Sequence, residues 1–238
     1  HSLARRSFGG ISLVGLLYPE KAIDSCELCR MDEYDPQRIP VVFVHGLMSD
    51  PHIWLNAVNA ICTDPELRRH YQPWYFVYPT AMGVTQSAKL LRESLMAARD
   101  RFDPDHNDPG MEQMVLVGHS MGGLLSRMQA TDSGEALWAS NFRKPLTGLN
   151  VSAATRDRLQ SSLFFKPLPF VKRTVFISTP HRGSEIASLS IVRRLASLIR
   201  IPLDSLTLAN ELLLGNTDAL SPQITEWGLF SFVSVGML

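Results

Sequence analysis

The sequence has no excess of charge of either sign. Its 238 residues include 23 basic and 23 acidic side chains, so the formal net charge at pH 7 is zero. A surface without a positive field does not attract phosphate groups, and we therefore predict no nucleic-acid partner. A hydrophobic fraction of 45% supports a buried core and excludes an intrinsically disordered chain.

Long apolar runs are also missing. The longest candidate, residues 11–18, contains Gly15 and is closed by Pro19. A membrane-spanning helix needs about 18 consecutive apolar residues or more, so no transmembrane helix is predicted. The sequence begins at His1, so a signal peptide would lie outside it.

Cysteine is scarce. The three cysteines are too few, and too odd in number, for a disulfide framework, although Cys26 and Cys29 form a Cys-x-x-Cys pair. A zinc site would need a second such pair or histidines at ligand spacing, and a thioredoxin-like site would need the pair to open a helix after a strand. We therefore expect no metal and interpret the pair as part of a loop or as a local disulfide.

From residue 38 onward, short β-branched runs alternate with segments of helical period. The expected strands are 41–44, 74–78, 114–117, 174–177 and 229–235, with helices after the first three strands, at 186–199 and at 203–214. This alternation predicts an α/β fold with a mainly parallel sheet. We expect one domain at residues 39–238, a cap inserted at residues 131–170, and an N-terminal extension of unknown role at residues 1–38.

The strongest motif is Gly118-x-Ser120-x-Gly122, placed between an apolar strand and a helix. This is the pattern of a nucleophile elbow, in which small residues let the chain turn sharply and expose the serine hydroxyl. The helix dipole and its free N–H groups would stabilise negative charge at an attacked carbonyl. We interpret Ser120 as a nucleophile and His119, whose side chain diverges from it, as a packing residue beside the turn.

His45 and Gly46 follow the first expected strand. Acyl transfer needs two backbone N–H donors directed at the developing oxyanion, and the glycine lets this loop approach a substrate closely. The Leu47 N–H and the Met121 N–H, immediately after the nucleophile, are the candidate donors.

Three segments resemble bacterial serine hydrolases of the α/β-hydrolase family, in its lipase and esterase branch. They are VVFVHGL at 41–47, VGHSMGG at 117–123 and FISTPHRGS at 176–184, and the resemblance covers the chain from Ile39 to Leu238. It implies an α/β-hydrolase fold with helices on both faces of the sheet, Ser120 as the nucleophile and an oxyanion hole at the two N–H groups named above.

The sequence departs from this family in its catalytic base. Family members have an acidic residue and then a histidine after the serine. In this sequence, His181 is the only histidine that follows Ser120. One interpretation makes His181 the base, with Glu185 or Asp204 as its partner. We favour the other, in which His181 is a structural or pocket-lining residue. The acid and the base are then expected beyond Leu238, so that the chain is incomplete at its C-terminus.

The leading hypothesis is cleavage of a small-molecule carboxylic ester or lipid through a covalent acyl-enzyme, without metal or cofactor. An acyltransferase or thioesterase on the same scaffold is an alternative, because another acceptor can replace water in the second half-reaction. A non-catalytic binding protein that keeps the fold is the second alternative. Membrane association and localisation, in the bacterial cell envelope or the cytoplasm, stay open.

Aromatic residues of the insertion and the leucines of 203–214 form either a lid over an acyl groove or ordinary core.

Overall fold

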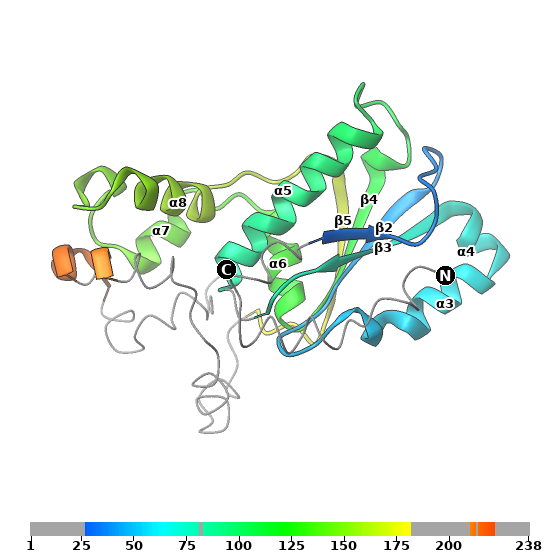
Figure 1. The fold of residues 1–238 in the computed structure, drawn as a ribbon, viewed down its shortest axis with the longest axis horizontal. Helices are drawn as coiled ribbons and strands as arrows, with labels where there is room; N and C mark the ends of the chain where they lie inside the picture. The colour runs from blue at the N-terminus through cyan, green and yellow to red at the C-terminus, as the bar shows by residue number, and fades with distance from the viewer. Residues whose placement is uncertain (1–26, 81–82, 182–209, 213, 222–238) are drawn as a thin grey trace.

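The computed structural model describes residues 27–80, 83–181, 210–212 and 214–221 (Figure 1). Its centre is a five-stranded sheet in the order β1-β3-β2-β4-β5. The strands are β1 (Glu27–Arg30), β2 (Ile39–Val44), β3 (Tyr71–Val77), β4 (Met114–His119) and β5 (Val171–Ile177). Strands β2 to β5 run parallel, and β1 pairs antiparallel with β3 at one edge.

Helices follow the strands in the alternating manner that parallel pairing requires. They are η2 (Pro51–Trp54), α3 (Leu55–Thr63), α4 (Pro65–His70), α5 (Val84–Phe102), η3 (Met111–Gln113), α6 (Met121–Ala130), α7 (Ala136–Asn141), η4 (Leu146–Gly148), α8 (Ala153–Leu163) and η6 (Thr217–Ala219). Asp64 illustrates how the sequence starts them: its carboxylate accepts hydrogen bonds from the first N–H groups of α4, and Pro65 occupies the first helical position.

The central strands β2, β3 and β4 are buried on both faces because their side chains alternate between two apolar clusters. Val42 and Val44 of β2 face the larger cluster, which includes buried residues of α5, α6, α7 and α8. Val41 and Phe43 face the smaller cluster, which includes Trp54 of η2 and Val58 of α3. The prediction of a mainly parallel sheet with helices on both faces is therefore confirmed.

The structure adds a strand within the predicted N-terminal extension, and it does not describe most of the predicted C-terminal elements. Residues 27–30, within the extension that had no assigned role, form the edge strand β1, with Cys29 opposite Tyr75. The predicted helix 186–199, the predicted strand 229–235 and most of the predicted helix 203–214 lie outside the described residues. Cys26 lies outside them as well.

The segment 131–170 contains α7, η4 and α8, and it shares the core of the sheet. Trp138, Phe142, Phe165 and Phe170 are all buried in the larger cluster. The ring of Phe164 packs against the same cluster. These aromatic side chains thus serve as core, and a lid function for the segment stays a prediction.

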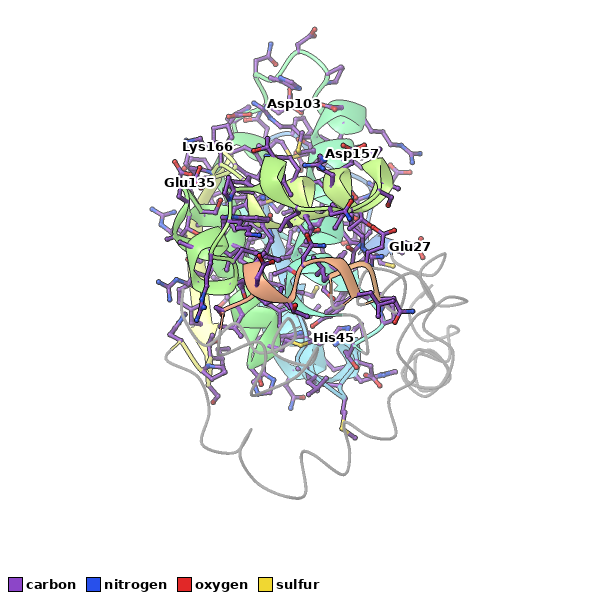
Figure 2. The ribbon with its side chains drawn as sticks, turned by 90° about the vertical axis from the view of Figure 1, so that its left-hand side faces the viewer. Glu27, His45, Asp103, Glu135, Asp157 and Lys166 are labelled. Carbon is purple, nitrogen blue, oxygen red and sulfur yellow. The ribbon has the colours of Figure 1, made fainter. Side chains whose placement is uncertain are left out.

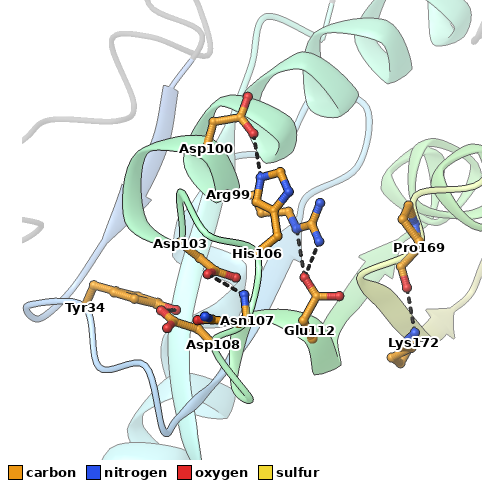
Figure 3. A network of polar contacts seen from close by, with 10 residues as sticks. All are labelled: Tyr34, Arg99, Asp100, Asp103, His106, Asn107, Asp108, Glu112, Pro169 and Lys172. Atoms are coloured by element: carbon orange, nitrogen blue, oxygen red, sulfur yellow. Dashed lines mark hydrogen bonds and ion pairs between the residues drawn. The ribbon is translucent and has the colours of Figure 1, made fainter.

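The loop between α5 and η3 lies at the amino ends of the central strands. Arg99 pairs with Glu112, His106 with Asp100, and the Tyr34 hydroxyl donates to Asp108 at 2.8 Å (Figure 3). These contacts stabilise the segment that leads into β4. Within the described ranges, no helix combines the length and apolar character needed to cross a membrane.

Candidate active site

Ser120 lies at the sharp turn between β4 and α6. Its backbone has φ 51° and ψ −121°, and a non-glycine residue keeps such a conformation only where the surrounding structure enforces it. The Ser120 N–H donates to the Ile177 carbonyl at 2.9 Å, and the Gly123 N–H donates to the Ser120 carbonyl at 3.0 Å. The turn therefore fixes the position of the Ser120 side chain at the N-terminus of α6.

The glycines around Ser120 leave no room for a side chain. A Cβ at Gly118 would lie 2.5 Å from the Gly122 carbonyl oxygen, and one at Gly122 would lie 2.2 Å from the Val44 carbonyl oxygen. A Cβ at Gly123 would lie 1.8 Å from Oγ1 of Thr179. The turn thus packs directly on the end of β2 and on the chain that follows β5.

The loop after β2 lies against the same serine. A Cβ at Gly46 would lie 3.0 Å from the Ser120 Cβ and 3.1 Å from Nδ1 of His119. Figure 2 shows His45, the first residue of this loop, at the end of the sheet opposite to Asp103. The structure therefore brings the described parts of the three motif segments together at the carboxyl ends of β2, β4 and β5.

Two backbone N–H groups flank this position without a protein acceptor among the described residues. The Met121 N–H opens α6, where an amide has no partner within the helix. The Leu47 N–H belongs to the loop after β2 and also donates to no described acceptor. The next amide, of Met48, donates instead to Oγ1 of Thr80 at 3.2 Å. The Leu47 and Met121 groups can accordingly donate to an anionic oxygen of a ligand.

His45 is enclosed in the interior, with only 2% of its surface exposed. Its ring stacks on Tyr78 at 4.4 Å between centroids, and its Nδ1 lies 3.1 Å from the Gly46 carbonyl oxygen. Burial lowers the pKa of His45 from 6.5 to about 4. The imidazole is therefore neutral at pH 7, with its proton on Nδ1, because the Gly46 carbonyl oxygen beside that nitrogen is an acceptor.

His181 has an arginine as its partner. Nη1 of Arg127, on α6, lies 3.3 Å from the His181 Nδ1, and the Phe176 ring meets the imidazole edge-on at 4.5 Å. Because a guanidinium can only donate, the Nδ1 of His181 accepts and the proton of the neutral ring sits on Nε2. A serine base needs the reverse arrangement, with Nδ1–H on a carboxylate and Nε2 unprotonated.

No described residue among those weighed in the sequence analysis is a carboxylate partner of His181. Glu185 and Asp204 lie outside the described ranges. Asp218, which the sequence left unassigned, is exposed and pairs with Lys144.

His119 meets the ring of Trp54 edge-on at 6.5 Å, and its Nδ1 is buried without a partner among the described residues.

Among the described residues, two other histidines are hydrogen-bonded to carboxylates. His106 pairs with Asp100 in the loop at the amino ends of the strands (Figure 3). His52 Nδ1 lies 2.8 Å from the carboxylate of Asp50, which also caps the start of η2. Over the described ranges, neither is hydrogen-bonded to Ser120. The same part of the chain holds no group of three or more His, Cys, Asp or Glu that could bind a metal ion.

Tyr78 and Thr80 are site residues that the sequence did not single out. Both are buried, with 2% and 5% of their surfaces exposed, and both hydrogen-bond to the backbone of the loop after β2. The sequence signal that could have identified them is their position directly after the strand that runs beside β2. That position can be recognised only once the strand order is known.

The model of the alpha/beta hydrolase family matches residues 41–228. Among solved structures, the mature form of the Bacillus licheniformis lipase BlEst2 is 18% identical, with a TM-score of 0.42 over 79% of this chain and 63% of that chain. A structure of esterase B from Lactobacillus rhamnosis with a tributyrin phosphonate is 12% identical, with a TM-score of 0.39 over 87% of this chain and 54% of that one. The chain thus spans less than two thirds of these proteins, and no curated protein matches it.

Proposed function

Because the chain belongs to the alpha/beta hydrolase family, we propose that it is a serine hydrolase that cleaves carboxylic esters through a covalent acyl-enzyme on Ser120. The observation that carries this proposal is the backbone of Ser120, held at φ 51° between β4 and α6. Strain of this kind at a polar residue, enforced by glycines that contact backbone, is typical of a functional site.

In the first step, Oγ of Ser120 attacks the ester carbonyl carbon and its proton passes to a base. The tetrahedral oxyanion is stabilised by the N–H groups of Leu47 and Met121, which have no acceptor among the described residues. The bond from carbon to the alcohol oxygen then breaks, and the alcohol leaves with the proton from the base. Water attacks the acyl-enzyme, and the carboxylic acid leaves as Ser120 regains its proton.

The base of this mechanism is proposed to lie outside the described residues. His181 accepts from Arg127 at Nδ1, so its neutral ring presents a proton, rather than a lone pair, at Nε2. We therefore retain the interpretation of His181 as a residue that lines or supports the site.

Exposed apolar side chains support an ester substrate with an apolar group. Leu47, Met48, Ile53 and Leu55 are each exposed by 38% to 52%, and they lie in the loop after β2 and in the adjoining η2 and α3. A binding site for a small molecule is usually lined mainly by apolar side chains with a few polar groups.

The test is turnover of a short-chain p-nitrophenyl ester by the protein in its full natural length. Ser120→Ala should lower kcat roughly 10⁴-fold or more. Ser161→Ala removes a comparable hydroxyl from the exposed face of α8 and should leave kcat within about threefold of the wild type. Undiminished turnover by Ser120→Ala would contradict the proposal.

A further inference from the structure

Beyond the buried His45 and Gly46, the loop that carries the Leu47 N–H has little packing of its own. Leu47 and Met48 are 38% and 47% exposed, and Met48 has a left-handed φ of 54°. An oxyanion donor must nevertheless be held in place before the reaction, because an error of about 1 Å can lower a rate by about 10²-fold. Something outside the loop must therefore fix it.

Two side chains directly after β3 contact the backbone on each side of Gly46 and Leu47. The Tyr78 hydroxyl donates to the His45 carbonyl at 2.7 Å. The Thr80 hydroxyl accepts from the Met48 N–H at 3.2 Å.

The register of the sheet explains why these two residues reach the loop. Val44, the last residue of β2, lies opposite Phe76 of the parallel neighbour β3. The residues that follow the two strands therefore leave the sheet side by side. Tyr78 also stacks on the rings of His45 and Phe76, with centroids 4.4 Å and 5.2 Å apart.

The His45 carbonyl connects this contact to the nucleophile. A Cβ at Gly122 would lie 2.4 Å from that carbonyl oxygen, so the oxygen sits between the Tyr78 hydroxyl and the first turn of α6. A shift of the carbonyl would change the position of the loop relative to Ser120, which contacts Gly46.

We propose that Tyr78 and Thr80 are positioning residues that hold the Leu47 N–H in place for the oxyanion. Neither touches the reacting atoms. Both act through the backbone at His45 and Met48, and the inference rests on the proposed function of Ser120.

The experiment compares kcat, KM and the inhibition constant of an alkylboronic acid for the protein in its full natural length. A boronate forms a tetrahedral anion on a serine and so reports the oxyanion site separately from ester binding. The variants are Tyr78→Phe, Thr80→Val and their combination. Thr80→Ser keeps the hydroxyl, and Tyr75→Phe makes the same change at a buried tyrosine of β3 on the opposite face of the sheet.

The double variant should lose about 10²-fold in kcat and in boronate affinity, with KM within about threefold of the wild type. Thr80→Ser and Tyr75→Phe should stay within about threefold in all three quantities. Unchanged kcat and boronate affinity in the double variant, or equal losses in Tyr75→Phe, would overturn the positioning role while Ser120→Ala still abolished turnover. Turnover that persists in the Ser120→Ala variant would instead overturn the proposed function itself.

Discussion

The imidazole of His45 is neutral because the fold removes it from water. Its pKa falls from 6.5 to about 4 on burial, whereas in the unfolded chain it takes up a proton near pH 6.5. Between these values the unfolded state binds more protons, so the free energy of unfolding decreases as the pH falls. This contribution is present in full above about pH 6.5 and is lost progressively down to about pH 4, to a total of about 3 kcal/mol.

His45→Asn tests this dependence, because the amide nitrogen can replace Nδ1 as donor to Gly46 and does not titrate. Between pH 7 and pH 4, the free energy of unfolding of the variant should decrease by about 3 kcal/mol less than that of the wild type. Urea denaturation at pH 7, 5.5 and 4 measures the difference. Parallel pH profiles for the two proteins would show that His45 does not titrate as described.

A second residue, His181, should tolerate replacement. Its Nδ1 accepts from Arg127, so it does not carry the unprotonated Nε2 that a serine base needs. We expect His181→Ala to keep kcat within about threefold to tenfold of the wild type, measured with a short-chain ester. A loss of roughly 10³-fold or more would instead identify His181 as the base.

Single residues also show what the sequence could predict. The sharp turn at Ser120 between Gly118 and Gly122 could be predicted because such a turn depends on local residue spacing. Tyr78 and Thr80 could not, since their role depends on the parallel pairing of β2 with β3 and on loop contacts across 32 or 33 residues of sequence. The arginine partner of His181 is 54 residues away in the chain and left no sequence signal.

At the scale of elements, the contact between β2 and α6 depends on Gly122. A Cβ there would lie 2.2 Å and 2.4 Å from the carbonyl oxygens of Val44 and His45, and backbone cannot rotate aside as a flexible side chain can. Gly122→Ala should therefore lower the free energy of unfolding by roughly 1–3 kcal/mol and reduce turnover as well.

The matched control is Gly148→Ala in η4, where the nearest atom to the new Cβ lies at 3.7 Å, an ordinary contact. It should change the free energy of unfolding by less than about 1 kcal/mol in urea denaturation. Equal stability of the two variants would contradict the tight contact between β2 and α6.

The parallel strands of the sheet were predictable because each contains an apolar run of β-branched or aromatic residues bounded by turn residues. The strand β1 was not, since the residues Glu27–Arg30 show neither alternation nor a β-branched run. Its position is set by pairing with β3, with Glu27 opposite Val77. The sequence alone holds no information on that pairing beyond a weak local propensity.

At the scale of the whole molecule, the segment 131–170 and the sheet share one core. Leu163 of α8 is 2% exposed and belongs to the same cluster as Leu116 of β4 and Leu91 of α5. We expect Leu163→Ala to lower the free energy of unfolding by about 2–5 kcal/mol. The loss should appear in a single transition.

Far-ultraviolet circular dichroism and tryptophan fluorescence during urea denaturation check this prediction together. The control is Leu214→Ala, at a side chain that is 87% exposed, which should change stability by less than about 0.5 kcal/mol. Two separate transitions, with only one shifted by Leu163→Ala, would show that the segment is an independent unit.

The most direct measurement of the central claim is the site of covalent modification by a fluorophosphonate, located by peptide mass spectrometry on the protein in its full natural length. The account predicts one phosphonyl group per molecule on Ser120, and no adduct in Ser120→Ala under conditions that modify Ser161→Ala fully. A protein that stays unmodified, or an adduct that persists in Ser120→Ala, would contradict it.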